Sequence, residues 1–259
     1  MSDVVRLETD GPLAVLTFDS PPLNLFDDAV FAGFREAVDR LAADPPRGLL
    51  IRAEGKVVSG GVDVGKVFDG MSPERGGALW DELLEAIHVL DELPLPTVFA
   101  AHGLCLTAAF EIALACDILL ASERAKFGLV EIVVGLTPSM GGPQRLAERA
   151  GPNRAKELIY TGELFDAATL ERWGVVNRVY AQDEFEASSR AFALKVANGP
   201  TKAHAATKRL VAAQKEGGAR AADAIVAEVS GPLFATEDLQ NAVKSFLADG
   251  PGRATYEGR

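Results

Sequence analysis

Near its middle the chain reads Gly103-Leu-Cys-Leu-Thr-Ala-Ala-Phe-Glu-Ile-Ala-Leu-Ala-Cys116, and Glu111 is the only charged side chain in that run. Glu131, a second isolated carboxylate, follows 20 residues later between Val130 and Ile132. A carboxylate removed from water is strongly disfavoured unless donors hold it or a raised pKa neutralises it. A raised pKa is what a general acid or base needs near neutral pH. For each glutamate taken alone, a structural hydrogen-bonded role is the alternative interpretation.

Composition narrows the class of protein. A chain of 259 residues with 48% hydrophobic and 24% charged residues can bury a large core and does not indicate disorder. The net charge of −11 argues against nucleic acid or an anionic membrane as the main partner. Cys105 and Cys116 lack the spacing of a zinc site or a disulfide framework. Neither an apolar signal segment nor a membrane span is expected, so the sequence predicts a cytoplasmic protein.

Hydrophobic periodicity predicts an α/β core. A hairpin is expected first, because Asp10-Gly11-Pro12 separates two short apolar runs. Strands and helices then alternate, which is typical of α/β architecture. The expected strands cover residues 4–9, 13–18, 48–53, 97–101, 118–121 and 175–179, and the expected helices cover residues 27–42, 74–93 and 106–116.

The last third of the chain has a different character. Helical patterns dominate from about Gly151, over residues 153–160, 167–173, 183–197 and 201–213. The turn-forming run Asn198-Gly199-Pro200 marks a soft boundary. We therefore predict a catalytic core over residues 1–197 and a helical region over residues 198–259 that docks on the core or on another subunit.

Backbone donors are expected beside Glu111. If a helix begins near Leu106 or Thr107, its first turn exposes unpaired N–H groups and the positive end of the helix dipole. Ala108 then lies in the first turn, and Glu111 falls on the same face about 5 Å further along the axis. The glycine loop Ser59-Gly60-Gly61-Val62-Asp63 allows backbone conformations that aim further N–H groups at a ligand. Taken alone, such a pair of glycines more often forms only a turn.

These motifs, in this order, resemble the crotonase, or enoyl-CoA hydratase/isomerase, family. The resemblance covers nearly the whole chain and is densest between Gly48 and Val179. Several motifs in one order are more specific than any one alone. They are the glycine loop at 59–63, Ala101-His-Gly-Leu-Cys-Leu-Thr-Ala-Ala-Phe-Glu111, Cys116-Asp-Ile118, Phe127-Gly-Leu-Val-Glu131, Gly135-Leu-Thr-Pro-Ser-Met-Gly-Gly-Pro-Gln-Arg-Leu146, Thr161-Gly162 and Trp173-Gly-Val-Val-Asn-Arg-Val179.

The resemblance implies a spiral of ββα repeats followed by C-terminal helices that assemble trimers, often paired as hexamers. It implies an acyl-CoA thioester substrate, with CoA entering only as part of that substrate and with no metal or other cofactor. By position, Val62 and Ala108 match the two N–H donors that hold the thioester oxygen. Glu111 and Glu131 match the two glutamates of the family's hydratases. The matching CoA- and substrate-binding positions are Lys56, Gly60, Gly61, Asp63 and Gly103.

Two departures keep other functions open. Thr107-Ala108-Ala109 stands where many members have three glycines, and Val130 replaces a common proline before Glu131. Hydration of an enoyl-CoA is the first expectation because both acids are present. Double-bond isomerisation, which needs one carboxylate, is an alternative, and a catalytically silent acyl-CoA-binding oligomer is another. His102 and Cys105 are weaker candidates for chemistry, since neither has an activating partner in a recognisable motif.

Overall fold

The computed structural model describes residues 4–259. Within this range a six-stranded sheet has the order β1-β2-β3-β4-β6-β9. β1 and β2 are antiparallel and form the expected hairpin, whereas the remaining neighbours are parallel. The strands are β1 (Val5–Asp10), β2 (Leu13–Phe18), β3 (Gly48–Ala53), β4 (Thr97–Ala101), β6 (Ile118–Ser122) and β9 (Arg178–Tyr180).

A smaller sheet of order β5-β7-β8 lies in the described chain beside the first. It consists of β5 (Leu104–Leu106), β7 (Lys126–Gly128) and β8 (Phe165–Asp166). The expected helix over residues 106–116 is therefore wrong at its start, because Leu106 ends a strand and the helix begins at Ala108. Backbone pairing decides this local structure: Leu106 N–H donates to the carbonyl of Ser59, and β5 runs parallel to β7.

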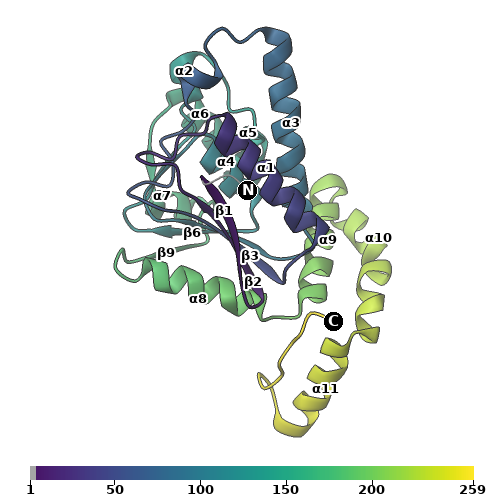
Figure 1. Cartoon of the computed structure of the whole chain (residues 1–259). Helices are drawn as coiled ribbons and strands as arrows, with labels where there is room; N and C mark the ends of the chain where they lie inside the picture. Colours follow the sequence, from purple (N-terminus) through teal and green to yellow (C-terminus); the bar gives the residue numbers. More distant parts are fainter. Residues whose placement is uncertain (1–3) are drawn as a thin grey trace.

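Helices cover both faces of the main sheet and extend beyond it (Figure 1). The helices of the core are α1 (Asp28–Ala43), α2 (Val64–Val67), α3 (Pro73–Glu92), α4 (Ala108–Ala115), α5 (Gly142–Ala150), α6 (Pro152–Thr161), α7 (Ala167–Arg172) and α8 (Phe185–Ala197), with a 3-10 turn η1 (Glu131–Val134). The C-terminal elements are α9 (Thr201–Gly217), α10 (Ala219–Ser230), η2 (Gly231–Ala235) and α11 (Glu237–Asp249). The α/β class and the helical C-terminal part are confirmed.

Alternation along the strands divides the interior into two apolar layers. Leu13 and Val15 of β2 pack with α8, whereas Leu16 and Phe18 of the same strand join the larger cluster under α1, α3 and α4. Successive side chains of a strand point to opposite faces, so a strand covered on both faces is apolar throughout. Because apolar side chains pack on both faces of the sheet, β4 and β6 are held in place, and so is α4, which lies between them in the chain.

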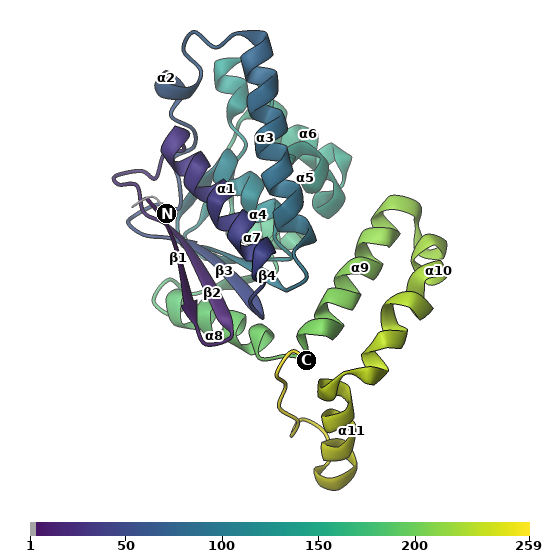
Figure 2. The ribbon, with the colours of Figure 1, turned by 45° about the vertical axis from the view of Figure 1, so that its right-hand side comes forward.

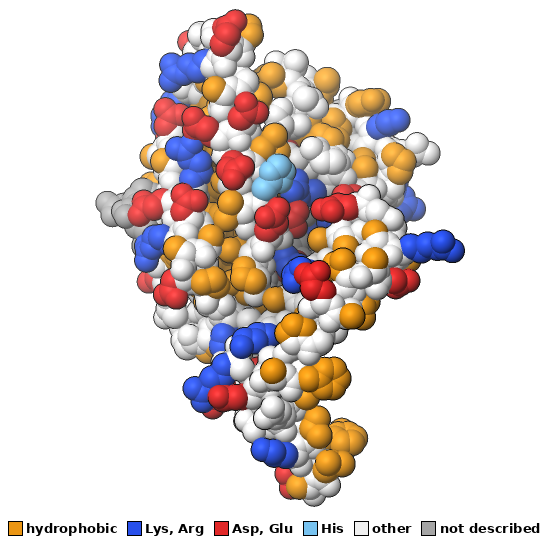
Figure 3. Space-filling model, turned by 90° about the vertical axis from the view of Figure 1, so that its right-hand side faces the viewer, with side chains coloured by type: hydrophobic (Ala, Val, Ile, Leu, Met, Phe, Trp, Pro, Cys, Tyr) orange, Lys and Arg blue, Asp and Glu red, His pale blue; other side chains and the backbone are white. Residues whose placement is uncertain are grey.

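The C-terminal helices project away from the sheet (Figures 1 and 2). The end of the chain folds back, since Asp238 of α11 accepts hydrogen bonds from the N–H groups of Glu257 and Gly258. Several large hydrophobic side chains of this part are exposed, among them Phe234, Phe246 and Leu247. Figure 3 shows hydrophobic side chains gathered at the lower right. The division at residue 197 stays a prediction. No helix among residues 4–259 is long and apolar enough to cross a bilayer.

Candidate active site

Glu111 lies in the first turn of α4 and is only 2% exposed. Its Oε1 accepts hydrogen bonds from the N–H groups of Met140 (2.9 Å) and Gly142 (2.8 Å). Burial raises the pKa of this carboxyl to about 7, although the two backbone donors and the nearby Arg145 oppose the rise. One oxygen is thus fixed by the protein, and the group changes charge near neutral pH.

The turn before α5 fits around this carboxylate because residue 142 has no side chain. A Cβ on Gly142 would lie 2.8 Å from Glu111 Oε1 and 2.9 Å from its Cγ. Neither atom can move far, since Oε1 is held by two donors. Glycine at this position lets a backbone N–H approach the carboxylate directly.

Glu131 begins η1 and is held quite differently. Burial, and after it the negative charge of Glu111, raise its pKa to about 8. The two carboxyl groups therefore lie within electrostatic range of each other. Glu131 Oε2 is buried and has no hydrogen-bond partner among the described residues. A buried oxygen without a donor favours the protonated acid.

The segments that carry the two expected backbone donors pair with each other just before Val62 and Ala108. Ser59 forms a parallel bridge with Cys105, and Leu106 N–H donates to Ser59 O. Val62, three residues further on, forms its own parallel bridge with Phe26, and Ala108 begins α4. The approach continues as far as Gly61, where a Cβ would lie 3.0 Å from Thr107 Oγ1. Within residues 4–259, neither the Val62 nor the Ala108 N–H has an acceptor.

Thr107 precedes α4 in a conformation that side chains rarely adopt. Its φ is +49° and its ψ is −123°, and a β-branched residue at positive φ is a genuine outlier. Its Oγ1 is buried and has no partner in the described part of the chain. Such strain costs of the order of 1 to 3 kcal/mol and clusters at functional sites. The strained residue here aims the first N–H groups of α4.

The glycine loop is built mainly from backbone contacts. Gly61 has φ +107°, donates its N–H to Ser59 Oγ and accepts from Phe26 N–H. Gly60 donates its N–H to Leu23 O. Asp63 caps α2 by accepting a hydrogen bond from Lys66 N–H.

The expected CoA-contacting residues lie on this same loop and beside it. Lys56 is exposed, and its carbonyl would be 2.9 Å from a Cβ at Gly103, so Gly103 permits a close backbone approach. Lys66 forms ion pairs with Asp27 and Asp63. His102 Nε2 contacts Gly55 O, and burial lowers the pKa of this imidazole. Among residues 4–259, Lys66 is engaged by two carboxylates, whereas Lys56 has no ion-pair partner.

The cysteines do not fit a nucleophilic role. Both are buried, and burial raises the pKa of each thiol, so the thiolate is disfavoured. Among residues 4–259, no three His, Cys, Asp or Glu side chains gather as a metal site would require. Asp117 accepts hydrogen bonds from the N–H and hydroxyl of Thr97, as expected for a structural role.

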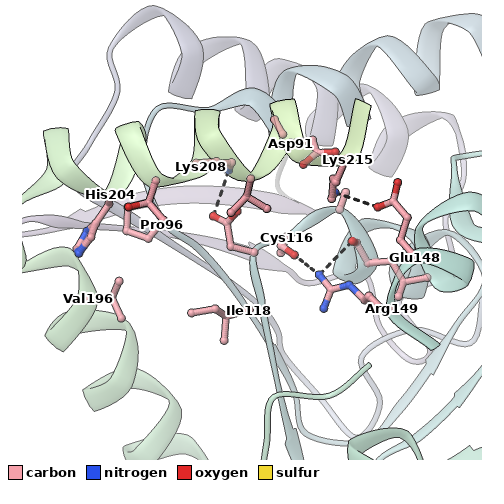
Figure 4. Close-up of a pocket in the computed structure, with 16 residues that line it drawn as sticks. Asp91, Pro96, Cys116, Ile118, Glu148, Arg149, Val196, His204, Lys208 and Lys215 are labelled. Atoms are coloured by element: carbon pink, nitrogen blue, oxygen red, sulfur yellow. Dashed lines mark hydrogen bonds and ion pairs between the residues drawn. The ribbon is translucent and has the colours of Figure 1, made fainter. Parts of the chain in front are cut away.

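A cavity of about 560 Å³ opens between α9 and the C-terminal end of α4 (Figure 4). Neither Glu111 nor Glu131 lines it. Ion pairs join its two walls, from Lys208 to Asp117 and from Lys215 to Glu148. The hollow is visible between the core and the C-terminal helices in Figure 3. It is separate from the paired glutamates.

Comparison with known proteins shows the family of this chain. The family model for enoyl-CoA hydratase/isomerase matches residues 8–253. The chain belongs to the enoyl-CoA hydratase/isomerase family. A protein of Mycobacterium tuberculosis named probable enoyl-CoA hydratase is 30% identical over 247 residues, which cover 95% of each chain. Carnitinyl-CoA dehydratase of Salmonella typhimurium is 32% identical over 83% of each chain.

Solved structures confirm the fold of this family. An enoyl-CoA hydratase from Geobacillus kaustophilus superposes with a TM-score of 0.93 at 25% identity, covering 100% of this chain and 98% of the other. The crotonase-like architecture expected from the motifs is thereby confirmed. The roles of the individual site residues stay predictions.

Three features of this family member's site were not expected from its sequence. The first is the pair of N–H donors from Met140 and Gly142, whose only signal was the double glycine 141–142 ahead of a helix. The second is the ion pair between Arg145 and Asp91. The third is the positive φ of Thr107, which the family's usual glycine at this place could have signalled.

Proposed function

We propose that this chain adds water across the 2,3 double bond of an enoyl-CoA thioester. The observation that carries the proposal is the pairing of Glu111 and Glu131, two carboxyl groups in electrostatic range with pKa values raised to about 7 and about 8. Water attack at C3 and protonation at C2 need two proton-handling groups on one side of the substrate. A single carboxylate would not supply both.

The proposed mechanism assigns each glutamate one proton transfer. Ionised Glu111, fixed through Oε1, accepts a proton from water with its other oxygen while the water oxygen bonds to C3. The electrons of the double bond move onto the thioester oxygen, giving an enolate. Protonated Glu131 then donates its proton to C2, and the carbonyl re-forms. The reverse sequence eliminates water, which is the reaction that the name of the Salmonella relative describes.

The enolate oxygen is assigned to the N–H groups of Val62 and Ala108. Both are free of intramolecular acceptors in residues 4–259, and the bridge between Ser59 and Cys105 joins the segments that carry them. A preorganised donor of this kind contributes about 3 kcal/mol to transition-state stabilisation. Backbone donation does not depend on side-chain identity, so alanine at position 108 preserves it. The proposed reaction uses no metal and no cofactor beyond the CoA of the substrate.

CoA binding is proposed along the loop that carries Lys56, Gly60, Gly61 and Asp63, with Gly103 packed behind it. The net charge of −11 repels the CoA phosphates at long range, so a local cation is needed. Lys56 is exposed and offers that cation. Replacing it by glutamine is expected to raise KM more than it lowers kcat.

The reaction is tested with crotonyl-CoA, followed by mass spectrometry for the gain of one water. E111Q and E131Q are each expected to fold and to lose activity by about a hundredfold or more. The control is E157Q, which changes an exposed glutamate of α6 and should leave turnover unaltered. Near-full activity in both active-site variants would refute the assignment.

Isomerisation and silent binding are distinguished in the same assay. Incubation with a 3-enoyl-CoA that yields the 2-enoyl isomer without gain of water would indicate an isomerase, for which protonated Glu131 alone could exchange protons. Tight thioester binding without turnover of any chain length would indicate a binding protein. Hydration of crotonyl-CoA would exclude the silent binding protein.

We further propose that the C-terminal helices assemble a trimer or a dimer of trimers in the cytoplasm. The exposed Phe234, Phe246 and Leu247 support this assignment because monomeric proteins rarely leave such a set uncovered. Light scattering after size-exclusion chromatography measures the assembly. Charged substitutions at Phe246 and Leu247 should reduce its mass.

A further inference from the structure

Arg145 is a buried cation on α5, with only 9% of the residue exposed. Its Nε and Nη2 both donate to Asp91 Oδ2, at 3.3 and 2.9 Å. Asp91, near the C-terminal end of α3, is partly exposed and lines the cavity shown in Figure 4. A buried charge acts on its surroundings with little screening by salt. The charge of Arg145 therefore also acts on the groups that lie on the other side of its guanidinium.

The other side of Arg145 faces the turn that holds Glu111. A Cβ on Gly141 would lie 2.1 Å from Arg145 Nη1, and a Cβ on Gly142 would lie 2.8 Å from Glu111 Oε1. The guanidinium and the carboxylate thus press against consecutive glycines of one turn. They form no direct ion pair, since Arg145 is bonded to Asp91 and Glu111 to backbone donors.

The charged groups near Glu111 come from three elements. Within the described chain, α4 has no other charge, η1 supplies Glu131, and α5 supplies Arg145 with Asp91 of α3 behind it. The remaining charges of α5 near this place are engaged elsewhere. Glu148 pairs with Lys215, and Arg149 donates to Leu114 O, Cys116 O and Val175 O.

We propose that the Arg145–Asp91 ion pair is a positioning device that sets the charge state of Glu111 and hence the pH range of the reaction. The inference rests on the proposed function for its catalytic meaning. Arg145 favours ionised Glu111 by attraction across the Gly141–Gly142 turn, and it lowers the pKa that burial raises. Asp91 partly offsets that attraction and anchors the guanidinium.

Two variants should act in opposite directions. R145Q removes the attracting cation, so the ionisation midpoint of Glu111 should rise by about one pH unit, a roughly tenfold change in the ionisation equilibrium. D91N removes the anion that offsets the cation, so the midpoint should fall by about half a unit. R145K keeps the charge and should stay close to the wild-type midpoint even if its contact with Asp91 weakens.

The midpoint is measured without substrate, by NMR titration of isotope-labelled glutamate carboxyl groups. The Glu111 resonance is identified by its loss in E111Q, and the series is made in the E131Q background so that one proton is followed. The control is R35Q. This variant removes an exposed ion pair between Arg35 of α1 and Glu82 of α3, the helix that also carries Asp91, and it should leave the midpoint unchanged. The acidic limb of kcat/KM in the Glu131-containing proteins should move in the same directions.

Opposite shifts in R145Q and D91N support the proposal. Shifts in the same direction, or midpoints within about 0.2 unit of the parent in both, overturn it and leave the ion pair a purely structural contact. If R145Q does not fold, R145K and D91N still decide, because a shifted R145K together with an unshifted D91N contradicts the electrostatic role. A protein that titrates as expected but turns over no thioester refutes the proposed function and not this inference.

Discussion

The α4 turn and the η1 turn present the same side chain in opposite ways. Glu111 at α4 is fixed by two backbone donors and faces a nearby arginine, whereas the buried Oε2 of Glu131 at η1 has no donor. Donors stabilise a carboxylate, and their absence stabilises the acid. The difference favours an ionised Glu111 and a protonated Glu131, which are the states that the proposed mechanism needs.

The glycines beside the two acids offer the largest test of this comparison. G142A places a methyl 2.8 Å from Glu111 Oε1 and should displace the carboxylate. A displacement of about 1 Å can reduce turnover by about a hundredfold. Turnover of crotonyl-CoA is measured with a circular dichroism spectrum as the check of folding.

The matched control for that variant is G135A, at the end of η1. Gly135 has φ +74° and nothing within 4 Å of a built Cβ, so alanine strains the backbone without touching Glu131. We expect a loss of about 1 kcal/mol in stability and little change in turnover. Equal loss of activity in G142A and G135A would show that close packing against Glu111 is not the cause of the loss in G142A.

The pH dependence of kcat/KM should be bell-shaped. Activity should rise as Glu111, with its pKa near 7, loses its proton, and fall as Glu131, with its pKa near 8, loses the proton it must donate. Outside the bell the rate should change by about tenfold per pH unit. Residual activity of E131Q should lack the alkaline limb, and that of E111Q should lack the acidic limb. A flat profile between pH 6 and 9 would contradict the division of roles.

The free energy of unfolding should depend on the protonation of Glu131 even when no substrate is present. The folded protein holds the proton of Glu131 more tightly than the unfolded chain, whose pKa is near the ordinary 4.5. Stability contributed by that proton is full below pH 4.5 and is lost as pH rises through about 8. E131Q should therefore gain stability relative to the parent at pH 9 and not at pH 4, as measured by urea unfolding.

Thr107 supplies the smallest expected effect. Its buried hydroxyl has no partner in the described residues, so T107V should raise the free energy of unfolding by about 1 kcal/mol. T107S, which keeps the hydroxyl and loses the methyl, should lower it by about 1 kcal/mol. A destabilised T107V would mean that the hydroxyl has a bound partner in solution. Urea unfolding at pH 7 measures both.

Most of the frame could be predicted from periodicity alone. The hairpin at Gly11, the strands over 48–53 and 97–101 and the helices flanking them match the structure closely, because each carries a local apolar pattern. β5 could not be separated from α4, since Leu104–Leu106 is three residues long and runs into an equally apolar helix. Pairing with Ser59 decides it, and that contact is 46 residues away in the chain.

The candidate site was predictable in its residue types but not in its electrostatics. The isolation of Glu111 and Glu131 in apolar runs indicated two unusual carboxylates. Glu111 is fixed by the turn at Gly141–Gly142, and no local pattern around Glu111 encodes that contact. The Arg145–Asp91 pair joins α5 to α3 and is likewise invisible in the sequence.

The parallel bridge between Ser59 and Cys105 has a consequence for how such proteins diversify. It joins the segments that carry the amides at 62 and 108 through main-chain atoms, and every amino acid except proline provides a backbone N–H. Mutation can therefore change the side chains around the substrate while the two N–H donors that we assign to the enolate oxygen are kept. Substrate preference, which depends on side chains, can thus change in evolution while the reaction, which depends on backbone donors, stays the same.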